Sequence, residues 1–460
     1  MNLSSLLKKP LVWLAVLLLA GLLGWWLAPH AIRALPSQIR FRLPEPVLAL
    51  VTTPVPTALP APAGPVDLAQ VGRLLPSATP LPPTPTLAPT PTLPATFTPA
   101  PTEAAATPVP PTPTATPSPA PTAVPTTPPL PAQVEIAGMS IVPQKFNNCG
   151  AANLSLVLDF YDHPVDQLDI AAVVRPTYDD RNASPSELVD FVNFNTPLRA
   201  ASYVGGDLPL LQRLLAAGYP VIVEKGLLLE EIEGWMGHYL TLFGYDDAAQ
   251  TFASLDTFLG PFDSVGRPET YERLLRYWHH FNYRFVVVYP PEAETAVAAL
   301  LGPTYTDPLA MWRHAADRAR ETAATSPNDA YAWFNYGSSL THLAELTGDA
   351  ALYADAATLF DQARTIGLPW RMLWYQFEPY AAYLGAGRPD EVLILADALL
   401  STEGGRGVEE TFLYRGHALL ARGDAAGARR AYRAALDIRP HFPEAEHALQ
   451  ALDAPATVVP

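Results

Sequence analysis

The sequence predicts an α+β domain followed by an all-α repeat region, with an apolar span and a long proline-rich segment in front of both. Three observations support this division. Helix-like runs after Cys149 are followed by short strand-like runs, which is the order typical of α+β domains. The chain from Asp307 to Leu452 is rich in Ala, Leu and Arg and predicts one helix after another. Of the 52 prolines, about half lie between Pro54 and Pro131.

We therefore expect five segments along the chain. They are an N-terminus with a transmembrane helix (1–32), a disordered Pro/Thr-rich stalk (33–132), the α+β domain (133–291), a connector (292–306) and the repeat domain (307–454).

The apolar span, Leu11–Ala28, contains no charged residue. As a helix it would reach about 27 Å, close to the roughly 30 Å of a bilayer core. Lys8 and Lys9 precede the span, and Trp25 and Trp26 lie at its far end, as expected at membrane interfaces. We expect a single-pass membrane protein whose N-terminus is cytoplasmic.

A cleaved signal peptide is the rival interpretation of this span. Its apolar part exceeds the usual length of about 7–15 residues and no clear A-x-A cleavage site follows, so an uncleaved anchor is favoured. Arg33, Arg40 and Arg42 follow the span and weaken the charge asymmetry that would fix its orientation.

The stretch from Val51 to Ala132 consists mainly of Pro, Thr, Ala and Ser. Repeated proline removes backbone donors, so we expect polyproline II conformation without a core. Such a stalk could extend on the order of 200 Å and would hold the folded domains away from the bilayer, on the extracytoplasmic side. An intracellular proline-rich ligand for adaptor domains is the alternative.

The formal net charge of -16 argues against nucleic-acid binding, because no basic stripe compensates it. His279 and His280 with Asp263 or Glu272 are the only arrangement that suggests a metal, and no H-E-x-x-H motif supports it. We therefore predict neither a metal nor another cofactor.

The α+β domain is predicted from seven runs of residues. Helices are expected at 151–161, 185–195 and 208–217, and strands at 220–224, 238–245, 251–258 and 283–289, with a turn at Asp246 and Asp247.

Cys149 is the only cysteine of the chain and lies at the start of the first predicted helix. Backbone N–H groups and the helix dipole at that position favour the thiolate and lower the pKa of a thiol. A lone cysteine is more often a small buried apolar residue, so its role depends on further residues.

Three residues supply a catalytic context for the thiol. His238 begins a predicted strand and could act as the general base, while Asp256, on the following strand, could orient the imidazole. With a turn near residue 247, we expect the two to lie opposite each other. Gln144, five residues before Cys149, could donate to an oxyanion.

These residues also carry a resemblance. The Gln-x4-Cys-Gly start, Gly237-His238-Tyr239, Gly244-Tyr245-Asp246 and the later Asp256 resemble the papain-like cysteine peptidase domain of the bacteriocin-processing, double-glycine leader peptidase family, in its stand-alone form. The resemblance implies a nucleophile at Cys149, a general base at His238, an orienting residue at Asp256 and an oxyanion donor at Gln144. No P-loop or transporter accompanies the domain, so leader removal coupled to export does not follow.

The C-terminal region contains an internal repeat that resembles tetratricopeptide repeats. Its best window holds Gly416, Ala428, Tyr432, Ala435 and Pro440, and an earlier window holds Trp333, Gly337, Ala356, Phe360, Ala363 and Pro369. A plain helical bundle is the alternative. Arrays of this kind bind peptides or partner proteins.

The sequence therefore predicts a membrane-anchored, surface-exposed cysteine peptidase that hydrolyses a peptide or protein substrate, with repeats that recruit the substrate or a protein partner. Two alternatives remain open. One is a non-catalytic peptide-binding adaptor, and the other is acyl transfer by the same residues.

Overall fold

The computed structural model describes residues 23–24, 26–28, 32, 58–75, 129–178, 180–229, 234–402 and 404–453. The chain divides into two compact units, Met1–Pro76 with Leu130–Pro460, and Ser77–Pro129. The second unit lies almost wholly outside the described residues, so everything below concerns the first.

The predicted membrane span lies mostly outside the described residues. Within the part of the chain that the structure describes, no helix combines the length and apolar character needed to cross a membrane.

An antiparallel seven-stranded sheet forms the centre of the α+β domain, with the order β2-β7-β3-β4-β5-β6 and β1 paired to the end of β4. The strands are β1 (Gln133–Glu135), β2 (Arg199–Tyr203), β3 (Val221–Leu229), β4 (Gly234–Asp246), β5 (Thr251–Leu255), β6 (Arg267–Thr270) and β7 (Phe285–Tyr289). β4 is the longest strand and carries His238.

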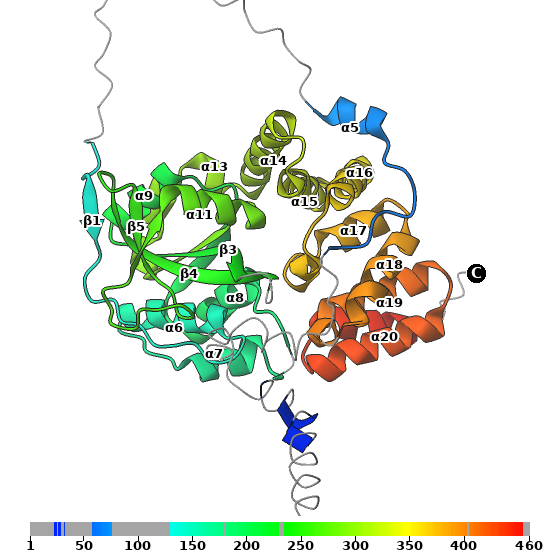
Figure 1. Ribbon diagram of the computed structural model, residues 1–460, viewed down its shortest axis with the longest axis horizontal. Helices are drawn as coiled ribbons and strands as arrows, with labels where there is room; N and C mark the ends of the chain where they lie inside the picture. The colour runs from blue at the N-terminus through cyan, green and yellow to red at the C-terminus, as the bar shows by residue number, and fades with distance from the viewer. Residues whose placement is uncertain are drawn as a thin grey trace, which may run out of the picture. The chain divides into compact units, whose positions relative to one another are not determined.

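Helices cover both faces of this sheet (Figure 1). α6 (Cys149–Phe160), α7 (Gln167–Val174) and α8 (Pro185–Asn195) share a core with Val286 and Val288 of β7. α9 (Leu208–Ala216), α11 (Tyr271–Trp278) and α12 (Glu294–Leu301) share another core with Phe285 and Val287. Successive β7 side chains alternate between the two cores because strand side chains point to opposite faces in turn.

The predicted α+β class is confirmed, and most predicted elements lie where expected. α8 has the predicted bounds, whereas α6 begins at Cys149 itself and β3 continues to Leu229. The strand predicted to reach Phe258 ends at Leu255, because the Asp256 carboxylate accepts hydrogen bonds from the backbone of Phe258 and Leu259 and turns the chain.

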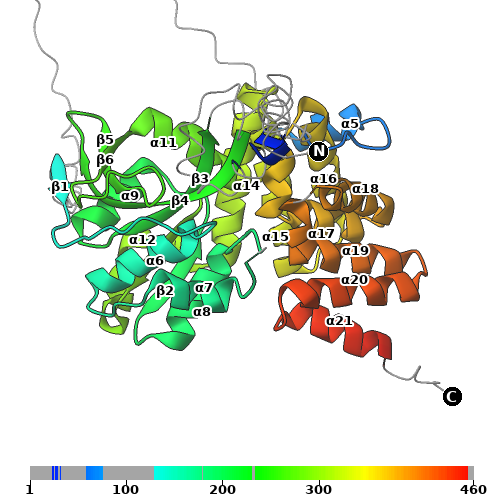
Figure 2. The same cartoon turned by 60° about the horizontal axis from the view of Figure 1, so that its bottom comes forward.

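Two short 3-10 turns flank β7, η1 (His279–Phe281) before it and η2 (Pro291–Ala293) after it, and the described residues of the C-terminal region then form helices. They are α13 (Pro303–Thr306), α14 (Pro308–Thr325), α15 (Ala330–Thr347), α16 (Ala351–Ile366), η3 (Trp370–Trp374), α17 (Glu378–Gly385), α18 (Pro389–Leu400), η4 (Gly404–Gly407), α19 (Glu409–Ala421), α20 (Ala425–Ile438) and α21 (Pro443–Asp453). Each long helix packs on its neighbour in sequence (Figure 2).

Two helix pairs make the same small-residue contact. Gly416 of α19 lies against the ring of Tyr432 of α20, where an added Cβ would lie 2.3 Å from the ring. Gly337 of α15 lies against Phe360 of α16, where an added Cβ would lie 3.0 Å away. In both pairs the glycine lets an aromatic ring fill the space between the helices.

The helical region packs on the α+β domain through η1. Asn335 of α15 donates to the carbonyl of His279 at 2.6 Å, and Gln376 donates to the carbonyl of His280 at 3.0 Å. Asn282 in turn donates to the Ser339 hydroxyl at 3.0 Å. Polar side chains therefore satisfy backbone groups across this boundary.

The prediction that the proline-rich stretch adopts polyproline II conformation without a core is wrong for residues 68–74. These residues form α5 (Leu68–Leu74), with Asp67 as its N-cap and Val71 buried against the helical region. The helix contains no proline, and its apolar side chains have a partner surface. Composition averaged over the whole stretch concealed this local pattern.

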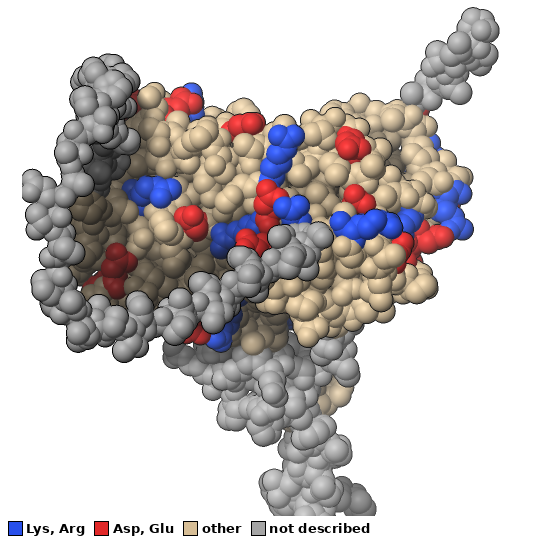
Figure 3. Space-filling model, turned by 90° about the horizontal axis from the view of Figure 1, so that it is seen from above, with Lys and Arg blue, Asp and Glu red and all other residues tan. Residues whose placement is uncertain are grey.

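Basic and acidic side chains are interspersed on the face of the molecule drawn in Figure 3. Ion pairs also join neighbouring helix positions, such as Arg320 with Asp317 and Arg276 with Glu272.

We expect Gly416→Ala to lower the free energy of unfolding of the helical region by about 1–3 kcal/mol, because the new methyl group would overlap the Tyr432 ring. Denaturant unfolding followed by circular dichroism would measure the change. Gly72→Ala in α5 is the control, since nothing lies within 4 Å of its added Cβ. Equal effects of the two substitutions would contradict the packing argument.

Candidate active site

The candidate site begins at the N-terminus of α6, where Cys149 is the first helical residue and is half-buried. The backbone N–H groups of Gly150 and Tyr239 donate to its sulfur, and His238 forms a side-chain hydrogen bond with it. Asn148 bonds with Gln167 and does not cap the helix, which leaves the sulfur at the positive end of the helix dipole.

His238 lies between the sulfur and a carboxylate. Its Nε2 lies 3.1 Å from Asp256 Oδ1, and both side chains are buried. Because Nε2 is engaged by Asp256, Nδ1 is the ring nitrogen that remains for Cys149. The three predicted residues thus form one hydrogen-bonded series, sulfur to imidazole to carboxylate.

The pKa values of the three groups shift together. Burial would raise the pKa of Cys149, but the hydrogen bond and charge of His238 and the two backbone N–H groups outweigh it, and the pKa falls below its ordinary value. Burial would lower the pKa of His238, yet Asp256 and Cys149 raise it to about 9. Burial likewise acts against the Asp256 carboxylate, whose pKa is nevertheless lowered to about 2, chiefly by His238. These directions favour a thiolate beside an imidazolium.

The register between β4 and β5 differs from the expected one. Leu255 pairs with Thr241, and the register shifts between Leu242 and Gly244 through a bulge. Continuing the pairing would set Asp256 opposite Leu240, so Asp256 approaches His238 diagonally. A bulge adds one residue to one strand and alters every pair beyond it, which a count from the turn does not reveal.

Gln144 lies beside the same loop. Its backbone N–H donates to the Thr257 carbonyl at 2.8 Å, and its side-chain oxygen accepts from the Thr257 hydroxyl at 3.0 Å. The amide oxygen is therefore held by Thr257, which orients the Nε2 donor away from it. No hydrogen bond among the described residues uses that Nε2.

Asn153 ties these parts together and was not predicted from the sequence. It is fully buried one helical turn after Cys149, and its amide nitrogen lies 2.9 Å from the Cys149 carbonyl, 3.0 Å from the Tyr239 carbonyl and 3.2 Å from Thr257 Oγ1. Its oxygen accepts from Thr241 at 2.7 Å. The available signal was a polar amide within the apolar run 151–158, where Ser155 is the other polar residue.

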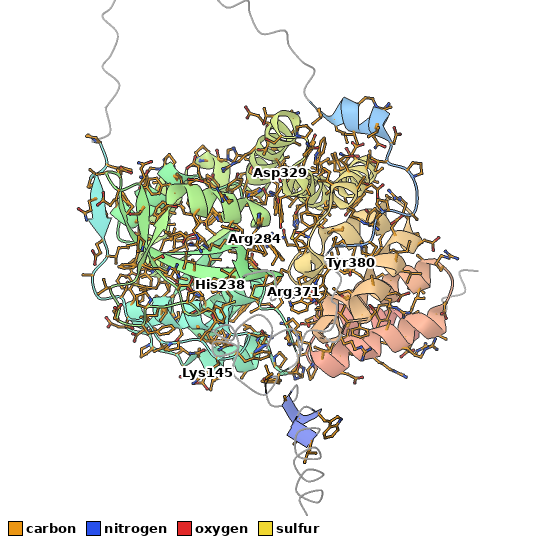
Figure 4. All side chains as sticks on the ribbon, viewed as in Figure 1. Lys145, His238, Arg284, Asp329, Arg371 and Tyr380 are labelled. Carbon is orange, nitrogen blue, oxygen red and sulfur yellow. The ribbon has the colours of Figure 1, made fainter. Side chains whose placement is uncertain are left out.

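The helical region reaches the rim of the site. Tyr375, directly after η3, accepts a hydrogen bond from the backbone N–H of Gly237, the neighbour of His238. An added Cβ at Gly237 would lie 3.0 Å from the Tyr375 ring, so the contact is close. Figure 4 labels His238 in the sheet and Arg371 of η3, which packs against β4.

The residues considered for a metal have other partners. His280 accepts from Trp235 Nε1 at 2.9 Å and stacks on Tyr331. Glu272 pairs with Arg276. Among the residues that the structure describes, no group of three or more His, Cys, Asp or Glu side chains could hold a metal ion.

Comparison with known proteins identifies the α+β domain. Residues 132–284 match the model of the peptidase C39-like family. This part of the chain is therefore similar to C39-like peptidases, and the resemblance predicted from Gln144 to Asp256 is confirmed at the level of the family.

Three crystal structures are similar to about a third of the chain. One, described as a C39-like peptidase from Bacillus anthracis, is 14% identical, with a TM-score of 0.28, 34% of this chain covered and 96% of the other. A double glycine motif protease from an AMS/PCAT transporter, in complex with its leader peptide, is 18% identical (TM-score 0.25; 34% and 98% covered). The peptidase domain of Streptococcus ComA, a bifunctional ABC transporter, is 17% identical (TM-score 0.26; 33% and 99%). No curated protein matches the chain.

We expect alkylation of Cys149 by iodoacetamide to remain fast well below the ordinary thiol pKa, because His238 stabilises the thiolate. In His238→Ala, the pH at half-maximal rate should rise, since only the two backbone N–H groups then oppose the effect of burial on the thiol pKa. The exposed His441→Ala is the control. Identical pH profiles in all three proteins would contradict the coupling.

The titration of His238 also sets an upper pH limit to the stability that this residue contributes to the fold. Because its pKa is raised to about 9, the imidazolium contributes stability that is complete below its unfolded pKa, about 6.5, and lost as pH rises through about 9. We expect the unfolding temperature of wild type relative to His238→Ala to fall across that interval. A constant difference from pH 6 to 10 would contradict the raised pKa.

Thr257→Val should slow acylation of Cys149 by p-nitrophenyl acetate about tenfold, because it removes the hydroxyl that orients Gln144 and accepts from Asn153. Thr257→Ser keeps the hydroxyl and should act like wild type. The rate of p-nitrophenolate release measures both.

Proposed function

We propose that residues 133–291 form a cysteine peptidase that hydrolyses peptide bonds. In this proposal Cys149 is the nucleophile, His238 the general base and acid, Asp256 the residue that orients the imidazole, and Gln144 an oxyanion donor. The observation that supports it is the continuous hydrogen-bonded series of Cys149, His238 and Asp256 at a helix N-terminus.

The chemistry follows from the protonation states that the pKa shifts favour. The Cys149 thiolate attacks the peptide carbonyl carbon, and the carbonyl oxygen becomes an oxyanion near Gln144 Nε2 and a backbone N–H at the start of α6. The His238 imidazolium then protonates the leaving amine, and the acyl-enzyme forms. Neutral His238 next removes a proton from water, which attacks the thioester carbonyl; the C–S bond breaks, the carboxylic acid product leaves, and the Cys149 thiolate and His238 imidazolium are restored.

The role of Gln144 can be separated from that of the triad. Gln144→Ala should slow acylation by p-nitrophenyl acetate about 100-fold or more, because this reaction develops an oxyanion. It should leave alkylation by iodoacetamide unchanged, because alkylation develops none. Gln450→Ala, at an exposed position, is the control. Equal losses in both reactions would show that the variant perturbs the thiolate instead.

Substrates can be identified with the nucleophile removed. A full-length Cys149→Ala protein in detergent micelles would be incubated with a peptide mixture, and retained peptides would be identified by mass spectrometry. Wild type should cleave the retained peptides, and His238→Ala should not. Binding without cleavage by wild type would favour the adaptor described below.

We also propose the remaining organisation from the sequence. Residues 1–32 anchor the chain in a membrane, 33–132 hold the folded part away from it on the extracytoplasmic side, 292–306 connect, and 307–454 form tetratricopeptide repeats that recruit substrate or partner. The matching contacts of Gly337 with Phe360 and Gly416 with Tyr432 support the repeats. Since α15 already contacts the α+β domain, recruitment would use other helices.

A non-catalytic peptide-binding adaptor is the second candidate. The contact of Tyr375 with the backbone of Gly237 favours it, because the helical region then limits access beside His238. Hydrolysis and transfer of the acyl group to an added amine would both exclude the adaptor, and product analysis with an amine acceptor distinguishes these two reactions.

A further inference from the structure

A segment of the chain far from the helical region in sequence lies on its outer helices. Residues 58–75 run beside α16, α17 and α18 in Figure 1, and they end in the short helix α5. Their contacts involve α16 and α18, together with Tyr336 of α15 and Leu368. The described residues of this segment therefore occupy a different surface from the α+β domain, which contacts α15 through Asn335.

The first half of the segment is held through its backbone. Arg364 donates from Nε to the Pro60 carbonyl at 2.9 Å and from Nη2 to the Ala61 carbonyl at 3.0 Å. The Ala63 N–H donates to Glu391 Oε1 at 2.9 Å, and the Leu59 N–H donates to the Leu368 carbonyl at 2.8 Å. A five-residue stretch thus has four backbone groups paired with the helical region.

Arg364 is also held in place by partners that do not belong to the segment. Its guanidinium is buried and pairs with Glu391 at 2.7 Å, and it also donates to the Tyr383 hydroxyl at 2.9 Å. These partners fix the planar group, so its Nε and Nη2 donors point at successive carbonyl oxygens of an extended chain. A buried guanidinium needs such acceptors, because an unpaired donor is costly away from water.

Apolar anchors at both ends of the segment and side-chain contacts of its second half add to this binding. Leu59 and Val71 are each only 7% exposed and belong to the core of the helical region. Gln70 donates to Asp355 at 2.8 Å and accepts from the Thr358 hydroxyl at 3.0 Å, while the Tyr336 hydroxyl donates to the Leu74 carbonyl at 3.1 Å. These contacts select a particular side-chain sequence, which backbone contacts alone would not.

A cavity of about 270 Å³ remains between the segment and the helices, lined by Pro65, Asp67, Thr358, Asp361 and Arg388 among others. The segment therefore binds along the surface of the helices and leaves an unfilled cavity along one side.

We infer that α16 and α18 form a binding site for an extended, proline-containing peptide that continues into a short amphipathic helix, and that residues 58–75 are its ligand within the same chain. Proline suits this site because Arg364 binds the carbonyl oxygens of Pro60 and Ala61, which proline retains, while the two N–H groups that are used belong to Leu59 and Ala63 and not to proline. The tether through residues 76–129 keeps the ligand at an effective concentration on the order of millimolar.

When residues 58–75 occupy the site, fewer residues would remain to span the distance between the membrane and the helical region. If residues 11–28 are a membrane anchor, as proposed above, the reach from the membrane to the helical region is set by residues 29–57 when the site is filled. That is at most about 100 Å, whereas residues 29–129 could reach roughly 350 Å when the site is empty.

Hydrogen exchange of the full-length chain tests the ligand in place. We expect peptides covering 58–75 to be protected from exchange in wild type. In Leu59→Asp their exchange should be at least tenfold faster. Leu68→Asp is the matched control, because Leu68 is 69% exposed, and it should behave like wild type. Exchange of wild-type 58–75 as fast as in Leu59→Asp would overturn the proposal.

Binding of a separate peptide tests the site itself. A fluorescent peptide of residues 58–75 should bind the full-length Leu59→Asp protein, whose own segment is released, saturably and below about 1 mM by anisotropy. Adding Arg364→Ala should weaken binding at least tenfold, and adding Arg429→Ala, whose side chain pairs with Asp453, should not. Absence of binding up to 1 mM would overturn the peptide site. Neither measurement uses the reactivity of Cys149, so the proposed peptidase stands or falls separately.

Discussion

The buried charge series of Cys149, His238 and Asp256 is the constraint on which the rest of the domain depends. Removing charges from water is unfavourable unless each finds hydrogen bonds of good geometry. The carboxylate receives the backbone N–H groups of Phe258 and Leu259 in addition to the imidazole, and the sulfur receives those of Gly150 and Tyr239. Because most of these donors belong to the backbone, the charges are satisfied only when α6, β4 and the loop after β5 meet with this geometry.

Asn153 explains how these three elements are kept together. Its single amide group contacts the first turn of α6, the backbone of β4 and Thr257 after β5. Thr257 then holds Gln144, so one buried amide links the position of the nucleophile with that of the proposed oxyanion donor. A side-chain amide can do this where an apolar residue cannot, because it offers donors and an acceptor in one rigid plane.

Much of the domain could be predicted because its signals are local. The period of apolar residues gave α8 its bounds, and the position of Cys149 before an apolar run gave the helix N-terminus. The diagonal approach of Asp256 to His238 could not be predicted, because it depends on a bulge and on a turn that ends β5 early. Asn153 was missed because its role arises from β4 and from the loop after β5, some ninety to a hundred residues later in the chain. Hydrogen bonds between residues so far apart produce no periodic pattern in the sequence.

The proline-rich stretch shows how the same chemistry can oppose and support structure. Proline cannot donate a backbone hydrogen bond, so this stretch builds no core of its own. Its carbonyl groups remain strong acceptors, however, and Arg364 supplies the donors that Pro60 and Ala61 need. Order in residues 58–75 therefore comes from the helices beneath them. The composition of a segment indicates which structure it can form alone. It does not predict the structure that the segment adopts on a complementary surface of the same chain, such as the one that contains the buried pair of Arg364 and Glu391.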